Sequence, residues 1–122
     1  MTTAGFEHTP SQGDFDAFAA LSGDDNPIHT DPAFAARTRF GKTVAHGMYL
    51  YVLLERLAAR LAPGRAVAET RLIFPAPARV GEALKFEGHD AAPDLLHLAA
   101  TRIEDGDCVC RLTLVLAPEA AS

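Results

Sequence analysis

A long apolar helix followed by strands is the feature that most limits how this chain can fold. The stretch 47–61, GMYLYVLLERLAARL, favours a helix and is apolar on nearly every side before Pro63-Gly64 ends it. A helix of this kind is expected to be buried on most sides. At 1.5 Å per residue it spans about 22 Å, enough to cross a small domain. We therefore expect the rest of the chain to fold around it.

Four segments after the helix have the composition and alternation of β-strands. They cover residues 65–74, 84–89, 95–103 and 108–116. Turn residues separate them, including residues 90–94 and the Asp-Gly pair of a hairpin at 104–107. Parallel strands would need crossover helices, and no sequence remains to form them. The sequence therefore predicts an α+β domain in which an antiparallel β-sheet wraps around a long central α-helix.

A strand is expected up to His8, and a capped helix follows it. Ser11 is the expected N-cap, with Asp14 at the capping-box position. Apolar residues at helical spacing continue to Gly23, a residue type that commonly follows a helix. This first helix therefore leads directly into Asp24.

Residues 24–30 are expected to form a loop, because Pro27 disfavours a helical conformation at the residue before it. A second short helix is expected next, with Asp31 as N-cap and a proline at its first position. It should run to about Arg39, before Gly41 stops it. The polar residues of the loop would thus be held between two helix ends.

The composition indicates a single domain over residues 1–122, of which 48% are apolar. The net charge of −5 comes from scattered acids and bases, whereas a nucleic-acid-binding protein would carry a basic face. No apolar run approaches the length of a membrane-spanning helix, and the chain starts without a secretory signal. Cys108 and Cys110 suit small apolar residues in a reducing compartment better than a disulfide or a metal site. We therefore expect a cytoplasmic protein that binds no nucleic acid, membrane or metal.

The segment from Asp24 to His29 contains a carboxylate, an amide and an imidazole. A carboxylate and an imidazole that converge on one point can hold a water molecule, remove its proton and return a proton elsewhere. Asn26 could orient either partner or stabilise the turn. Taken singly, each residue could equally satisfy backbone groups or lie on the surface. Because all three lie beside a buried helix, we interpret them as candidate catalytic residues.

Gly47 opens the apolar helix directly after His46. A glycine there leaves a backbone N–H that no side chain shields, and helix N-termini carry partial positive charge. Such a donor can stabilise an oxygen that gains negative charge, as in an oxyanion hole. The ordinary alternative is that the glycine allows close packing and His46 caps the turn. We interpret Gly47 as a candidate catalytic residue and His46 as a candidate substrate-binding residue.

Two motifs resemble those of the MaoC-like, (R)-specific enoyl-CoA hydratase family. Residues 24–29, DDNPIH, resemble its D-x-N-P-x-H signature, and residues 44–48, VAHGM, resemble its second block. Residues 74–81, with prolines ahead of a Val-Gly pair, are similar to a connecting segment of the family. The resemblance covers nearly the whole chain. It implies a hot-dog fold, in agreement with the sheet and helix expected from the residues themselves.

The resemblance also implies hydration of a trans-2-enoyl thioester to the (R)-3-hydroxyacyl thioester, or the reverse dehydration. Asp24 and His29 would together bind the catalytic water, and Asn26 would support their geometry. The N–H of Gly47 would bind the thioester carbonyl as it becomes enolate-like. No cofactor is implied beyond the coenzyme A that the acyl-CoA substrate itself carries.

Some bacterial members of the family carry a serine on the core helix where this chain has Glu55. A glutamate on a buried helix is costly unless it is paired or faces water. Glu55 could replace the serine in the substrate site, or it could face a subunit interface. Between the two motifs, Arg37, Arg39 and Lys42 are candidates for contacting the anionic coenzyme A, or else they are solvated surface charges.

The other histidines, His8, His89 and His97, have no acidic partner at motif spacing and are expected to be structural or surface residues. Tyr49 and Tyr51 lie on the apolar helix and are expected to pack there instead of reacting.

Other functions fit the same fold. The enzyme could act on 3-hydroxyacyl groups of acyl carrier protein, or on a branched or carboxylated acyl-CoA. A thioesterase would place its carboxylate differently around the helix, and a non-catalytic acyl-CoA-binding subunit would be expected to lack Asp24 or His29. Pairing two copies edge to edge would cover the open edge and flank of the sheet, so we expect a homodimer.

Overall fold

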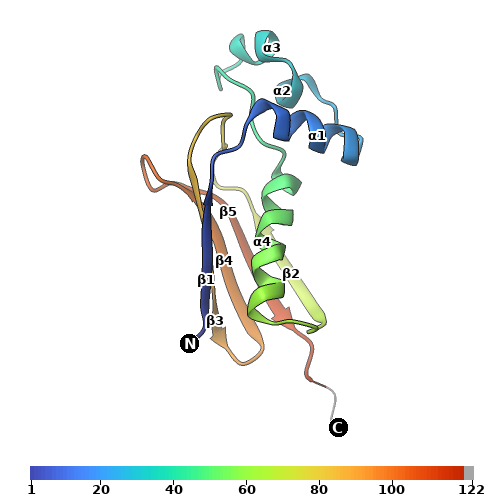
Figure 1. Cartoon of the computed structure of the whole chain (residues 1–122), viewed down its shortest axis with the longest axis vertical. Helices are drawn as coiled ribbons and strands as arrows, with labels where there is room; N and C mark the ends of the chain where they lie inside the picture. Colours follow the sequence, from blue (N-terminus) through green and yellow to red (C-terminus); the bar gives the residue numbers. More distant parts are fainter. Residues whose placement is uncertain (120–122) are drawn as a thin grey trace.

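The computed structural model describes residues 1–119 and shows one long helix lying along a five-stranded sheet (Figure 1). The strands are β1 (Thr3–His8), β2 (Val67–Ile73), β3 (Leu84–Ala92), β4 (Leu95–Arg102) and β5 (Cys108–Leu116). The helices are α1 (Gln12–Ser22), α2 (Pro27–Thr30), α3 (Pro32–Ala36) and α4 (Gly47–Leu61). The predicted architecture, an antiparallel sheet packed on a central helix, is confirmed.

The strands follow the order β1-β3-β4-β5-β2, and every neighbouring pair is antiparallel. The turn between β4 and β5 contains the predicted Asp-Gly pair, where Gly106 has a φ of 76° that favours glycine. The predicted turn at 90–94 is too long, because β3 continues to pair with β4 as far as Ala92. The two edges of the sheet, β1 and β2, come from distant parts of the sequence.

The core lies between α4 and the inner face of the sheet. Leu50, Leu54 and Leu57 of α4 are at most 2% exposed. They belong to one cluster with buried side chains of the sheet, among them Phe86, Leu98 and Leu112. No helix within residues 1–119 is long and apolar enough to cross a membrane.

The expectation that α4 is buried on most sides is wrong for this chain alone. Met48 is 50% exposed and Val52 is 42% exposed. The sheet covers one side of the helix, and α1, α2 and α3 gather beyond its N-terminal end (Figure 1). The side of α4 that carries Met48 and Val52 therefore remains open.

The first helix forms as predicted. The side chain of Ser11 accepts a hydrogen bond from the Asp14 N–H, and the Asp14 carboxylate accepts one from the Ser11 N–H. Gly23 ends α1 with a φ of 81°. These reciprocal caps fix the direction in which the chain enters the polar segment that follows.

The predicted loop at 24–30 is wrong in its second half, because Pro27–Thr30 forms one helical turn, α2. Proline disfavours helix at the preceding residue, yet its fixed φ suits the first position of a new helix. Asn26 caps this turn, since its side-chain oxygen accepts a hydrogen bond from the Ile28 N–H at 3.0 Å.

The following helix, α3, begins with the predicted cap and ends earlier than predicted. The Asp31 carboxylate accepts hydrogen bonds from the N–H groups of Ala33 and Phe34. Both the backbone N–H and the hydroxyl of Thr38 donate to the Ala35 carbonyl, which closes the helix well before Arg39.

Candidate active site

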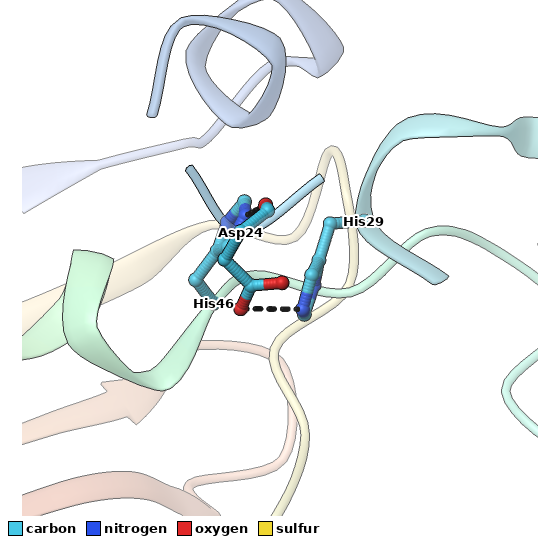
Figure 2. Close-up of side chains that lie close together, drawn as sticks. All are labelled: Asp24, His29 and His46. Atoms are coloured by element: carbon cyan, nitrogen blue, oxygen red, sulfur yellow. Dashed lines mark hydrogen bonds and ion pairs between the residues drawn. The ribbon is translucent and has the colours of Figure 1, made fainter. Parts of the chain in front are cut away.

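The first predicted pair, Asp24 and His29, comes together at the ends of two helices. Asp24 follows the C-cap of α1, and His29 lies on α2. The Nε2 atom of His29 is 3.7 Å from Oδ2 of Asp24. The two side chains point toward each other (Figure 2). The Asp24 side chain is 57% exposed and that of His29 only 14%, so the carboxylate is the solvent-facing partner.

The hydrogen bonds of His29 define which ring nitrogen is free. Its Nδ1 lies 2.8 Å from the Val44 carbonyl oxygen, which can only accept, so Nδ1 carries a hydrogen and donates it. In the neutral ring, Nε2 therefore has a lone pair, and this atom faces Asp24. An imidazole in this tautomer can accept a proton from a water molecule held beside the carboxylate.

Asn26 contributes through its backbone more than through its side chain. Its N–H donates a 3.4 Å hydrogen bond to Oδ1 of Asp24, while its amide oxygen is occupied in capping α2. Asn26 is exposed, and its backbone carbonyl accepts a 2.9 Å hydrogen bond from the His29 N–H. Its side chain forms no hydrogen bond with His29 or His46 among residues 1–119. It supports the carboxylate and the helix that carries His29.

His46 is buried behind the pair. It is 2% exposed, and its Nε2 donates a 2.8 Å hydrogen bond to the backbone carbonyl of Asp24. Its ring stacks on that of His29, with centroids 3.8 Å apart and planes 23° apart. Its Nδ1 is buried without a hydrogen-bond partner in the described part of the chain.

Gly47 begins α4 beside a cavity of about 570 Å³. Asp24, His46 and Gly47 line this cavity together with apolar side chains such as Leu50, Phe74 and Val109. His29 is not among its lining residues, but it contacts two residues that are, Asp24 and His46. No side chain among residues 1–119 caps the first turn of α4. The N–H groups of Tyr49 and Leu50 donate to the His46 carbonyl, so those of Gly47 and Met48 are the ones available to a carbonyl oxygen.

A potential cation site is formed by the same three side chains. One ligand atom each of Asp24, His29 and His46 lies within 4.8 Å of the others. A metal ion lies in the plane of each imidazole that binds it, and the two stacked rings are nearly parallel. Their lone pairs therefore do not converge, and the arrangement suits proton transfer better than metal binding.

The predicted cationic residues lie away from this cavity. Arg37, Arg39 and Lys42 are exposed and do not line it. None of the three forms an ion pair within residues 1–119, although the Arg39 guanidinium lies 4.9 Å from the ring centroid of Phe40. Their charges are thus available to a ligand.

Glu55 does not line this cavity either. It is exposed on α4 and accepts a 2.8 Å hydrogen bond from the hydroxyl of Tyr51. Burial, followed by this bond and the charge of Glu55, raises the pKa of Tyr51 to about 12. In this chain, the Glu55 carboxylate therefore has its hydrogen-bond partner on its own helix.

His8 has an acidic partner in space, Asp14, although not at the spacing of the Asp24–His29 motif. Its Nε2 is 3.5 Å from Asp14 and 2.7 Å from the hydroxyl of Tyr49. His89 and His97 face each other across β3 and β4, with ring centroids 5.7 Å apart.

Sequence reasoning missed Phe74 and Val44. Phe74 covers the start of α4, and the Val44 carbonyl selects the tautomer of His29. An apolar residue such as Phe74 beside a connection can indicate a buried contact. The role of the Val44 backbone carbonyl cannot be read from the sequence, because every residue has such a carbonyl.

The arrangement of these residues agrees with the comparisons with known proteins. A family profile described as a MaoC like domain matches residues 2–92, so the chain belongs to the MaoC-like domain family. The solved (R)-hydratase of Aeromonas caviae involved in PHA biosynthesis has a TM-score of 0.84 at 29% identity, covering 97% of this chain and 95% of that one. The fold is accordingly the hot-dog fold predicted from the motifs.

Two curated relatives match the chain over part of its length. A 3-hydroxybutyryl-CoA dehydratase of Methylorubrum extorquens is 45% identical over 74 residues, which is 59% of this chain and 47% of the relative. An (R)-specific enoyl-CoA hydratase of Aeromonas caviae is 44% identical over 73 residues, 58% of this chain and 54% of the relative. The matched stretch thus spans about half the length of these relatives.

Proposed function

We propose that the protein catalyses the reversible, (R)-specific addition of water to trans-2-enoyl-CoA. The observation that carries this proposal is the lone pair of His29 Nε2, which faces the Asp24 carboxylate across 3.7 Å. A water molecule beside both groups can donate to each of them. The names of the two curated relatives, an enoyl-CoA hydratase and a hydroxyacyl-CoA dehydratase, support the same reaction.

In the proposed reaction, the oxygen of this water attacks C3 of the enoyl group while Asp24 and His29 take up one of its protons. A proton is delivered to C2, so the addition leaves the pair in its starting state. Between the attack at C3 and the protonation of C2, the thioester carbonyl oxygen carries negative charge, and the N–H groups at the start of α4 stabilise it. Base and acid roles are not divided, because two coupled groups share their titration. The chemistry needs no cofactor besides the substrate's coenzyme A.

The decisive assay follows the loss of the ultraviolet absorbance of crotonyl-CoA. We expect Asp24→Asn and His29→Ala to lower kcat by about 10²–10⁴-fold, since each removes a group that transfers a proton. His97→Ala is the matched control, because His97 is exposed on β4 outside the cavity. Unchanged rates in both Asp24 and His29 variants would refute the mechanism, and an inactive wild type would favour a non-catalytic acyl-CoA-binding role.

A second candidate substrate is a 3-hydroxyacyl group on acyl carrier protein. Arg37, Arg39 and Lys42 are exposed without ion-pair partners within residues 1–119, and such charges suit either the phosphates of coenzyme A or an acidic carrier. Comparing the same acyl chain on both carriers decides between them. We expect a higher kcat/KM with coenzyme A, and Arg37→Ala and Arg39→Ala should raise KM without changing kcat.

A further inference from the structure

We infer that His46 is a positioning residue that holds both members of the Asp24/His29 pair, instead of a residue that binds substrate. Its ring contacts both of them. The Nε2–H group donates to the backbone carbonyl of Asp24 at 2.8 Å, and the ring face stacks on His29 at 3.8 Å. Only the predicted fall in kcat rests on the proposed function.

The hydrogen bond fixes the segment that carries the carboxylate. Asp24 is exposed, and its N–H donates a 3.1 Å hydrogen bond to the hydroxyl of Ser22, two residues earlier in the chain. Its carbonyl is held by a side chain that is 2% exposed and located at the N-cap of α4. A buried anchor on the core helix thus sets the position of an exposed catalytic carboxylate.

The stacking contact restrains the ring of His29 in the same way. The Val44 carbonyl holds Nδ1, and the face of His46 limits rotation of the ring about that bond. Phe18 also packs near His46, with ring centroids 5.0 Å apart. Nε2 of His29 is therefore kept facing Asp24.

The unpartnered Nδ1 of His46 points to a functional reason for this residue. A buried acceptor without a hydrogen bond lowers stability, and an apolar ring of similar shape would avoid the loss. A histidine is accordingly not the choice that stability alone would favour here. What it adds over phenylalanine is the hydrogen bond to Asp24.

Two substitutions separate the two contacts. His46→Phe keeps a planar ring that can stack on His29 and removes the donor to Asp24. His46→Gln keeps a donor for the Asp24 carbonyl and removes the ring. His97→Phe and His97→Gln are matched controls, because His97 is exposed and lies outside the cavity.

We expect each His46 variant to lower kcat by about 10- to 100-fold with little change in KM, as displacement of a catalytic group does. The thermal midpoint of His46→Phe should not fall. Imidazole ¹⁵N spectra should show His29 as the Nδ1–H tautomer in the wild type and in His46→Phe, and as a mixture in His46→Gln. Amide exchange of the residues after Gly23 should quicken in His46→Phe.

A rise in KM with unchanged kcat would overturn the inference in favour of substrate binding. If kcat and the thermal midpoint fell together while the His29 tautomer stayed unchanged in His46→Gln, the inference would be overturned, and His46 would have a structural role only. Should the wild type lack hydratase activity, the proposed function fails, while the ¹⁵N and exchange measurements still decide whether His46 holds the pair.

Discussion

The phenyl ring of Phe74 lies directly over Gly47, so a Cβ atom at position 47 would fall 2.7 Å from Cζ of Phe74. Gly47 is not among the glycines with positive φ, so its backbone conformation does not require glycine. The conflict is a steric one with the ring tip of Phe74, a side chain that is 47% exposed, and it arises at the helix end proposed to bind the thioester carbonyl. An alanine at position 47 therefore fits only if this ring moves.

Gly47→Ala should lower kcat/KM for crotonyl-CoA by at least about tenfold, because the added methyl group displaces the Phe74 ring, which lines the cavity, and crowds the N–H groups. The double variant Gly47→Ala, Phe74→Ala relieves the contact and should recover part of the loss. Steady-state kinetics of the two single variants and the double variant test this coupling. Strictly additive losses would show that the ring does not mediate the effect.

Local sequence patterns predict the helices and turns around the site, but they do not predict contacts between residues far apart in the chain. Ser11 and Gly23 mark the ends of α1, because capping depends on neighbouring residues. Asp24 and His29 were found together because they occupy one short motif. The exposed side of α4 was missed, since an apolar sequence does not reveal how far the sheet extends around a helix.

The roles of individual site residues depended on contacts that the sequence cannot display. The sequence predicts His46 as a substrate-binding residue, and His46 does line the cavity, but only the structure shows that its ring also packs against His29 and bonds to the Asp24 backbone. For Glu55 the sequence leaves open the substrate site or a subunit interface; in this chain it bonds to Tyr51 and does not line the cavity, and the interface stays a prediction. Each role depends on the direction of the side chain, at the N-cap of α4 for His46 and within α4 for Glu55.

Arg102 secures the connection that carries Phe74. It is 7% exposed, and its guanidinium donates to the Pro77 carbonyl at 2.6 Å and to the carboxylates of Asp105 and Asp107. Arg102→Met should lower the free energy of unfolding by about 1.5–3 kcal/mol, the usual contribution of a hydrogen bond from a charged group. Chemical denaturation measures this, with Lys85→Met as the control, because the Lys85–Glu87 ion pair is exposed.

The destabilisation by Arg102→Met should also depend on pH. The hydrogen bond from Arg102 lowers the pKa of Asp105 from its ordinary value of 3.8. A carboxylate with a lowered pKa in the folded state contributes stability above its ordinary pKa, and this contribution is lost as the pH falls through the lower folded value. The difference in stability between wild type and variant should therefore shrink below pH 3.8. A difference that stays constant from neutral pH to pH 3 would contradict this.

The two cysteines should differ sharply in reactivity. Cys110 is fully buried, and this burial, with a smaller effect of Cys108, raises the pKa of its thiol to about 12. Cys108 is partly exposed. Because the thiolate is the reactive form, iodoacetamide at pH 8 should modify Cys108 in the native protein and reach Cys110 only after unfolding. Mass spectrometry of the peptide that contains both residues distinguishes the outcomes, and equal native rates would contradict the assigned burial.

We propose that a second copy of the chain covers the β2 edge and the open side of α4. On β2, Val67 is 47% and Ile73 50% exposed, and Met48 and Val52 are exposed on α4. Between Val67 and Ile73, β2 also exposes the ion pair of Glu69 and Arg71, whereas the other edge, β1, exposes polar residues such as Glu7 and no large apolar side chain. Unpaired edge strands with apolar side chains favour pairing with another strand.

Light scattering should then give twice the chain mass of 13.0 kDa. Ile73→Lys should shift the protein toward monomer, because it places a charge within the apolar surface of β2. Ile103→Lys is the matched control, since Ile103 is 47% exposed in the turn between β4 and β5 and lies outside that surface. A dimer that withstands Ile73→Lys but dissociates in Ile103→Lys would place the contact at the β4–β5 turn, and a monomeric wild type would exclude the pairing altogether.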